Sequence, residues 1–187
     1  MVPLMSLWMP ILLSAVIVFV ASSIIHMVLP YHRTDYAPMP QQDQVMDAVR
    51  PFNIPPGEYM VPRAANMADM KTPAFKEKME RGPVFMISVF RPGDWGMGGR
   101  LLQWFVFSVL VSLFAAYIAS RTLPPGTDYL QVMRIAGTVA FASYSLGNLP
   151  NSIWYNHKWS TAFKNLFDGL IYGLLTGGTF GWLWPAM

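Results

Sequence analysis

The chain has 187 residues, of which 53% are hydrophobic and only 12% are charged. Soluble domains carry roughly 25% charged residues, so the composition indicates an integral membrane protein. The net charge of +3 is spread thinly along the chain, which argues against nucleic acid as a partner. Cysteine is absent, and this excludes disulfides, thiolate metal sites and a cysteine nucleophile.

Stretches with few or no charges predict four transmembrane helices. The clearest is the uncharged run from Leu101 to Ser120, whose length as a helix is about 30 Å, the thickness of the hydrocarbon core. The first stretch has no preceding Lys or Arg and no obvious cleavage site after it, so we expect it to stay as a membrane anchor. The predicted spans are residues 7–29, 100–120, 133–150 and 166–184. We therefore predict an all-α integral membrane protein, with helix 1 in residues 1–30 and a three-helix region in residues 100–187.

The proline-rich segment of residues 31–99 separates the first two predicted spans. Residues 42–50 place valines and a methionine on one helical face before a proline, which predicts a short amphipathic helix. The N-cap threonine Thr72, Pro73 and Gly82 frame a second helix over 73–81. Residues 58–62 and 84–90 predict short strands. We expect a small mixed α/β segment whose core is too small to stand alone, so that it lies against the membrane or a partner.

The distribution of basic residues predicts the orientation. Lys and Arg near the helix ends mark the cytoplasmic side of a membrane protein. Two arginines flank the turn between the second and third predicted spans, Arg121 and Arg134. The opposite side carries more: Arg33, Arg91, Arg100, Lys158 and Lys164. This count places the long segment in the cytoplasm and both termini outside, in a bacterial cytoplasmic (inner) membrane.

A ridge of small residues marks the last predicted span. Its four glycines recur every four residues: Gly169, Gly173, Gly177 and Gly181. Each glycine costs a helix roughly 1 kcal/mol relative to alanine, but in a bilayer small residues let two helix backbones approach closely. The ridge predicts a helix–helix contact.

Four ionisable residues are candidates for chemistry. His26, His32 and His157 are predicted near one membrane face, where imidazoles could bind a metal or a cofactor or relay protons. The spacing of six between His26 and His32 places them on different faces of a continuous helix, although Pro30 intervenes. Asp168 is a candidate ion or proton site because an ionisable residue in a span is expensive to bury. A plain ion pair with Lys164, one turn earlier, is the alternative.

Abundant packing surfaces and the lack of catalytic motifs favour a non-enzymatic role. We expect a small accessory or scaffold subunit of a larger membrane complex, whose partners are lipids and either other integral membrane subunits or further copies of itself. The alternatives are a component of an oligomeric channel or transporter, and a membrane enzyme or cofactor- or metal-binding protein that uses the histidines. The sequence indicates no catalytic residue, cofactor or substrate.

Overall fold

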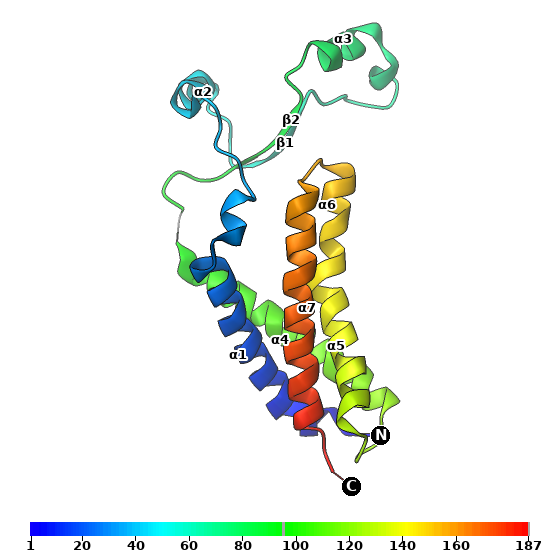
Figure 1. Cartoon of the computed structure of the whole chain (residues 1–187). Coiled ribbons are helices and arrows are strands. Elements are labelled where there is room, and N and C mark those ends of the chain that lie inside the picture. The colour runs from blue at the N-terminus through cyan, green and yellow to red at the C-terminus, as the bar shows by residue number, and fades with distance from the viewer. Residues whose placement is uncertain (95, 187) are drawn as a thin grey trace. The chain divides into compact units, whose positions relative to one another are not determined.

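The computed structural model describes residues 1–94 and 96–186, and its secondary structure is mostly helical (Figure 1). The chain forms two compact units. The first combines residues 1–37 with the chain from Gly96 onward, and the second is the intervening segment that starts at Pro38. The candidate site described below lies entirely in the first unit.

The first unit is a bundle of four long helices. These are α1 (Trp8–Ser23), α4 (Met97–Thr122), α5 (Tyr129–Ser145) and α7 (Trp159–Trp182), and the short α6 (Leu149–Trp154) lies between α5 and α7. The most extensive contact is between α5 and α7, while α1 packs against both α4 and α7 (Figure 1). Both α4 and α7 therefore contact α1, and both contact α5.

Two of the helices are long enough and apolar enough to cross a membrane. They are the helical run Leu4–Val28, with a mean hydropathy of 2.5, and Met97–Thr122, with a mean hydropathy of 2.1. They correspond to the predicted spans 7–29 and 100–120, the first of which ends one residue earlier than predicted. The predicted spans 133–150 and 166–184 correspond to α5 and α7, but α5 is only 17 residues long and contains Arg134, and α7 starts as early as Trp159 and contains Lys164 and Asp168.

The first helical run changes its hydrogen bonding near its end. Residues Ile24–Val28 form a π-helical turn, in which the Leu29 amide donates to the Ile24 carbonyl at 3.1 Å. Leu29 is extended, because the proline that follows disfavours the helical conformation for the residue before it. Pro30 then starts a separate 3₁₀-helix, Pro30–Thr34. The helix is thus interrupted between His26 and His32, and the chain changes direction there.

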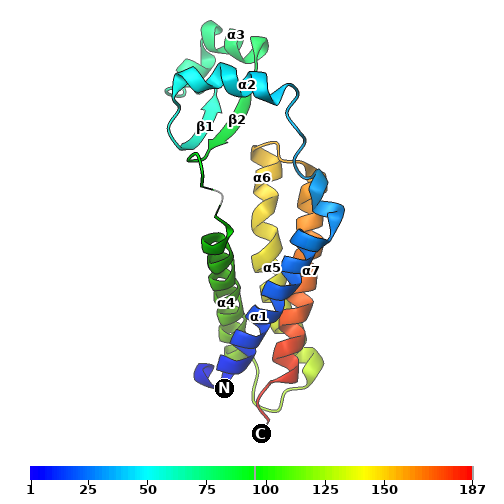
Figure 2. The ribbon, with the colours of Figure 1, turned by 90° about the vertical axis from the view of Figure 1, so that its left-hand side faces the viewer.

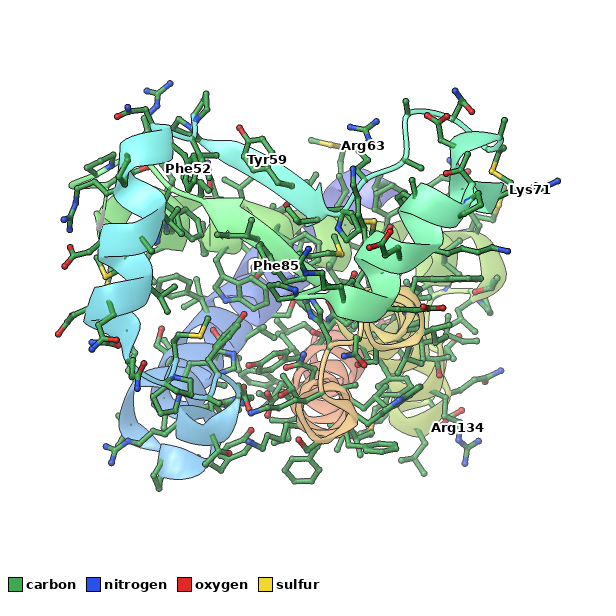
Figure 3. The ribbon with its side chains drawn as sticks, turned by 90° about the horizontal axis from the view of Figure 1, so that it is seen from above. Phe52, Tyr59, Arg63, Lys71, Phe85 and Arg134 are labelled. Atoms are coloured by element: carbon green, nitrogen blue, oxygen red, sulfur yellow. The ribbon has the colours of Figure 1, made fainter. Side chains whose placement is uncertain are left out.

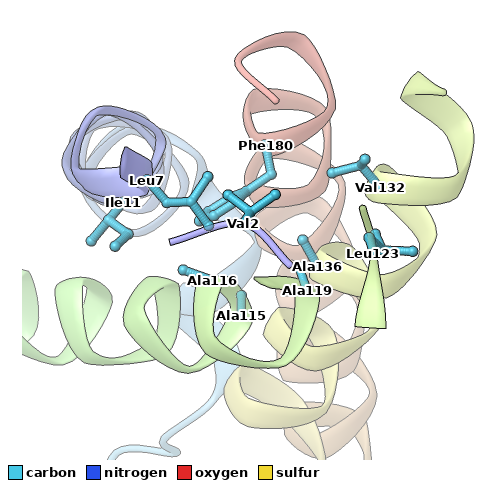
Figure 4. Packing of buried hydrophobic residues seen from close by; sticks show 10 residues of the cluster. All are labelled: Val2, Leu7, Ile11, Ala115, Ala116, Ala119, Leu123, Val132, Ala136 and Phe180. Carbon is cyan, nitrogen blue, oxygen red and sulfur yellow. The ribbon is translucent and has the colours of Figure 1, made fainter. Parts of the chain in front are cut away.

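An apolar cluster fills the bundle toward the ends of α4 and α7. Phe180, Leu7 and Val132 are its largest fully buried side chains, and buried alanines complete the cluster (Figure 4). The labelled members come from the N-terminal segment, α1, α4 and the residue that follows it, α5 and α7. At this end the Gly126 amide donates to the Pro185 carbonyl at 2.8 Å, and the Trp184 indole N–H donates to the Pro124 carbonyl at 3.0 Å. The α4–α5 turn and the C-terminal segment are therefore neighbours.

The second unit contains a small antiparallel sheet, formed by the two short strands that the sequence predicts. Strands β1 (Gly57–Val61) and β2 (Phe85–Val89) pair with Gly57 opposite Val89 and Val61 opposite Phe85 (Figure 2). Figure 3 labels Tyr59 and Phe85 on the two strands. The unit also holds α2 (Gln42–Val49) and α3 (Pro73–Arg81). The Thr72 hydroxyl caps α3 by accepting from the Phe75 amide at 3.3 Å, and Gly82 follows the last helical residue.

The four ridge glycines face α5 within the same chain. A β-carbon on Gly177 would lie 2.5 Å from the Met133 carbonyl oxygen, and one on Gly173 would lie 2.9 Å from that of Gly137. A β-carbon on Gly169 would overlap the Ser145 hydroxyl, and one on Gly181 would meet Tyr129. Since most of these neighbours are backbone or the base of a side chain, α5 and α7 approach each other at a distance that only glycine permits.

We predict that Gly177→Ala lowers the thermal stability of the protein in detergent. The new methyl group would push against the α5 backbone, and such overpacking costs about 1–3 kcal/mol. The control is Gly178→Ala on the same helix, where the nearest atom is the terminal hydroxyl of Tyr129 at 3.2 Å, which can move aside. Thermal unfolding followed by circular dichroism compares the two. A Gly177→Ala variant as stable as the Gly178→Ala variant would contradict the close contact.

Candidate metal centre

A compact group of ionisable side chains lies where the 3₁₀-helix after α1 meets α7. Three possible ligand atoms, one each from His26, His32 and Asp168, lie within 4.8 Å of one another. Asp168 is buried, His32 is mostly buried and His26 is exposed. The group thus reaches from the surface of the first unit to its interior.

His32 lies between two carboxylates. Its Nδ1 atom is 2.6 Å from Asp35 Oδ2, and its Nε2 atom is 2.8 Å from Asp168 Oδ2. The three side chains retain only 12%, 11% and 4% of their accessible surface, so the contacts are shielded from water. Two such contacts fix both the position of the imidazole and the direction of its ring plane.

Lys164 supports Asp35 from α7. Its Nζ atom donates to Asp35 Oδ1 at 2.7 Å, to the Thr34 hydroxyl at 2.9 Å and to the Tyr31 carbonyl at 2.5 Å. Burial opposes ionisation of Asp35, but hydrogen bonds from Lys164 and His32 outweigh it and hold the pKa of Asp35 below its usual value. Asp35 is therefore a carboxylate at neutral pH, able to accept the Nδ1 proton of His32.

Asp168 and His26 are also held by aromatic neighbours. The Tyr31 hydroxyl donates to Asp168 Oδ1, while His32 contacts the other carboxylate oxygen. The His26 ring lies edge-on to the His32 ring, with a centroid separation of 4.3 Å. Tyr31 is 4.2 Å from His32 by the same measure.

The break in the helix at Pro30 explains why the two histidines meet. On an uninterrupted α-helix a spacing of six residues would separate their side chains. Here His26 lies in the π-helical turn, and His32 lies in the 3₁₀-helix that starts at Pro30. The reset in direction between them brings the rings together. π-Helical turns of this kind occur frequently at functional sites.

The predicted candidates therefore fall into two places. His26, His32 and Asp168 converge, whereas His157 lies in a separate hollow with asparagines and Lys158. The ion pair of Lys164 is with Asp35, while Asp168 contacts His32 and Tyr31. Sequence reasoning missed both Tyr31 and Asp35. For Asp35 the available signal was its spacing of three from His32, since residues three apart face each other on a helical turn. The sequence carried no comparable signal for Tyr31.

The geometry of the group fits a transition-metal ion. Imidazole nitrogen and carboxylate oxygen bind such ions at about 2.0–2.2 Å, so two adjacent ligand atoms are separated by roughly 3 Å. The distance of 2.8 Å between His32 Nε2 and Asp168 Oδ2 is close to that value. The contact from Asp35 to the other nitrogen of His32 is the carboxylate–histidine arrangement that orients metal-binding imidazoles.

Comparisons with protein-family models, with curated proteins and with solved structures find no match to this chain. The functional argument therefore depends on the arrangement of the side chains alone.

We predict that Lys164→Met destabilises the first unit. The change removes three hydrogen bonds and leaves the Asp35 carboxylate without its cation, and a lost bond to a charged group costs about 1.5–3 kcal/mol. The control is Arg50→Met, because the Arg50–Asp47 pair retains 68% exposure on both sides and exposed pairs contribute about 0–1 kcal/mol. Thermal unfolding in detergent measures both. Equal, small effects would show that the Lys164 network is as weak as a surface pair.

Proposed function

We propose that this protein is a polytopic membrane protein that binds a divalent transition-metal ion through His26, His32 and Asp168. One observation carries the proposal: three ligand atoms converge within 4.8 Å while a second carboxylate, Asp35, holds the remaining nitrogen of the central histidine. The converging atoms supply the ligand set, and a proton on Nδ1 held by Asp35 would leave Nε2 free to bind an ion.

The ligand set favours Zn²⁺ or Fe²⁺ over other ions. Two imidazoles and one carboxylate are typical of catalytic zinc and non-haem iron sites, which keep one or more positions open for water or substrate. Ca²⁺ and Mg²⁺ prefer sites made of oxygen atoms alone, and Cu⁺ prefers sulfur. Because His26 is exposed, the open positions would face outward from the bundle.

The same proposal includes four membrane spans, with α5 and α7 as the third and fourth. Two features support it. α7 packs against α1, one of the two helices that are apolar enough to cross a membrane, and α5 packs against the other, α4. The hydrogen bonds between the α4–α5 turn and residues 184–185 bring together ends that four alternating spans would leave on one side. Both termini outside and a bacterial inner membrane remain part of the proposal.

Metal binding ranks above the other functions that the sequence suggested. The glycine ridge contacts α5 of the same chain, so it no longer argues for an external subunit as the partner. Apolar side chains around Phe180 and Leu7 fill one end of the bundle, which does not favour a pore through a single copy. The converging ligand atoms instead favour the histidine-based alternative.

We predict that the purified protein binds Zn²⁺ and Co²⁺, with His26→Ala and Asp168→Asn each weakening binding at least tenfold. Asp35→Asn should weaken binding about 10–100-fold, because loss of the orienting carboxylate has effects of this size in other metal sites. Isothermal titration in detergent measures affinity, and the visible spectrum of bound Co²⁺ reports the ligand set.

The matched control for that experiment is His157→Ala, which removes the remaining histidine of the chain and should leave both affinity and spectrum unchanged. The chain has no cysteine to compete for the metal. Affinity that survives His26→Ala but is lost in His157→Ala would refute the site. Stoichiometric binding of neither ion to the wild type would refute the function.

We predict from the four-span topology that an introduced cysteine at residue 126 reacts with an impermeant thiol reagent in intact cells, whereas one at residue 70 reacts only after lysis. The native chain contributes no background labelling because it lacks cysteine. Labelling of residue 70 but not of 126 would invert the orientation. Labelling of both positions in intact cells would contradict the single span that the topology places between them.

A further inference from the structure

The polar hollow that contains His157 lies in the first unit, at the start of α7. Its volume is about 230 Å³, and α6, the loop after it and the first turns of α7 supply most of its lining. None of its lining residues is acidic. The polar side chains that matter here are Asn148, Asn151, His157, Lys158, Thr161 and Asn165.

The hollow offers hydrogen-bond donors that the chain itself does not use. The Thr161 hydroxyl oxygen is buried and has no hydrogen-bond partner among the described residues. Lys158 Nζ donates one hydrogen bond to the Thr34 carbonyl at 3.0 Å, which leaves two of its three N–H groups for a ligand. The backbone of His157 is fixed by a hydrogen bond from its amide to the Asn151 carbonyl at 3.3 Å.

The N-terminus of α7 adds an electrostatic field that favours a negatively charged ligand. Lys158 is the N-cap residue of the 24-residue α7, and neither a capping side chain nor an acidic residue occupies the first turn. Amides at a helix N-terminus point outward and favour negative charge. Asp35 lies in an adjoining hollow, but its carboxylate is already paired with the Lys164 ammonium and in contact with His32. The hollow therefore combines a cation, a helix N-terminus and amide donors without an opposing free carboxylate in its lining.

We infer that this hollow binds a phosphate group, either on a phospholipid headgroup or as free phosphate. A phosphate presents several acceptor oxygens and a negative charge, which is the complement of the donors described above. The inference uses none of the three proposed metal ligands, so its failure leaves the metal site intact.

The experiment compares two ligands on delipidated full-length protein. Inorganic phosphate is titrated calorimetrically in detergent, and retention of phosphatidylglycerol is measured by native mass spectrometry. The test variants are Lys158→Gln and Thr161→Val, and the control is Lys76→Gln in α3 of the second unit. Thr161→Val nearly conserves shape, so it remains informative if Lys158→Gln, which alters a bond to Thr34, fails to fold.

We expect both test variants to lose at least fivefold in affinity or retention, with the control unchanged. Binding of inorganic phosphate that the variants lose identifies a site for free phosphate. Retention of phosphatidylglycerol alone, lost in the same variants, identifies a headgroup site. The inference would be overturned if neither ligand binds, or if Thr161→Val leaves the binding unchanged.

Discussion

A buried carboxylate in α7 determines how this end of the bundle is built. Asp168 is nearly inaccessible, and a buried charge without partners is strongly unfavourable. His32 and Tyr31 satisfy its two oxygens, and both come from the 3₁₀-helix that follows the first helical run. That helix therefore has to pack against α7, which places Asp35 beside Lys164. The burial of Asp168 thus accounts for its contacts with His32 and Tyr31 and for the contact between Asp35 and Lys164.

The burial of Asp168 depends in turn on the glycines that follow it. Gly169 lies against the Ser145 side chain, and Gly173 lies against the backbone of Gly137. Side chains at these positions would separate α5 from α7 and lose the dispersion contacts between them. The same packing holds Tyr172, one turn after Asp168, against Tyr144 of α5, with a ring-centroid separation of 5.3 Å. The helix contact and the polar cluster are therefore two parts of one arrangement, in which close packing creates the shielded environment that the ion pairs occupy.

The sequence predicted the regular parts of this structure and missed its irregular ones. Apolar runs located the helical run Leu4–Val28 and α4, and the Thr72 and Gly82 signals located α3. The prediction placed the start of α7 at residue 166, whereas the helix begins at Trp159. The residues before Asp168 include polar ones that bury poorly in lipid, so the search for apolar runs did not include them. Both histidines were candidate metal ligands, but their contact could not be predicted because it depends on a π-helical turn, of which hydrophobic periodicity carries no sign. Pro30 marked the break but not its direction.

The proposed metal site shares its residues with contacts that stabilise the fold, and His26 separates the two roles. His32, Asp35 and Asp168 already contact one another in the absence of an ion, so the proposed ligands are preorganised and their ordering would add little cost to binding. Substitution of any of them disturbs both stability and ligand geometry. His26 is exposed, and among the described residues it takes no hydrogen bond, its ring lying edge-on to that of His32. A structural ion network would not depend on such a residue, whereas a metal centre needs it as the third ligand.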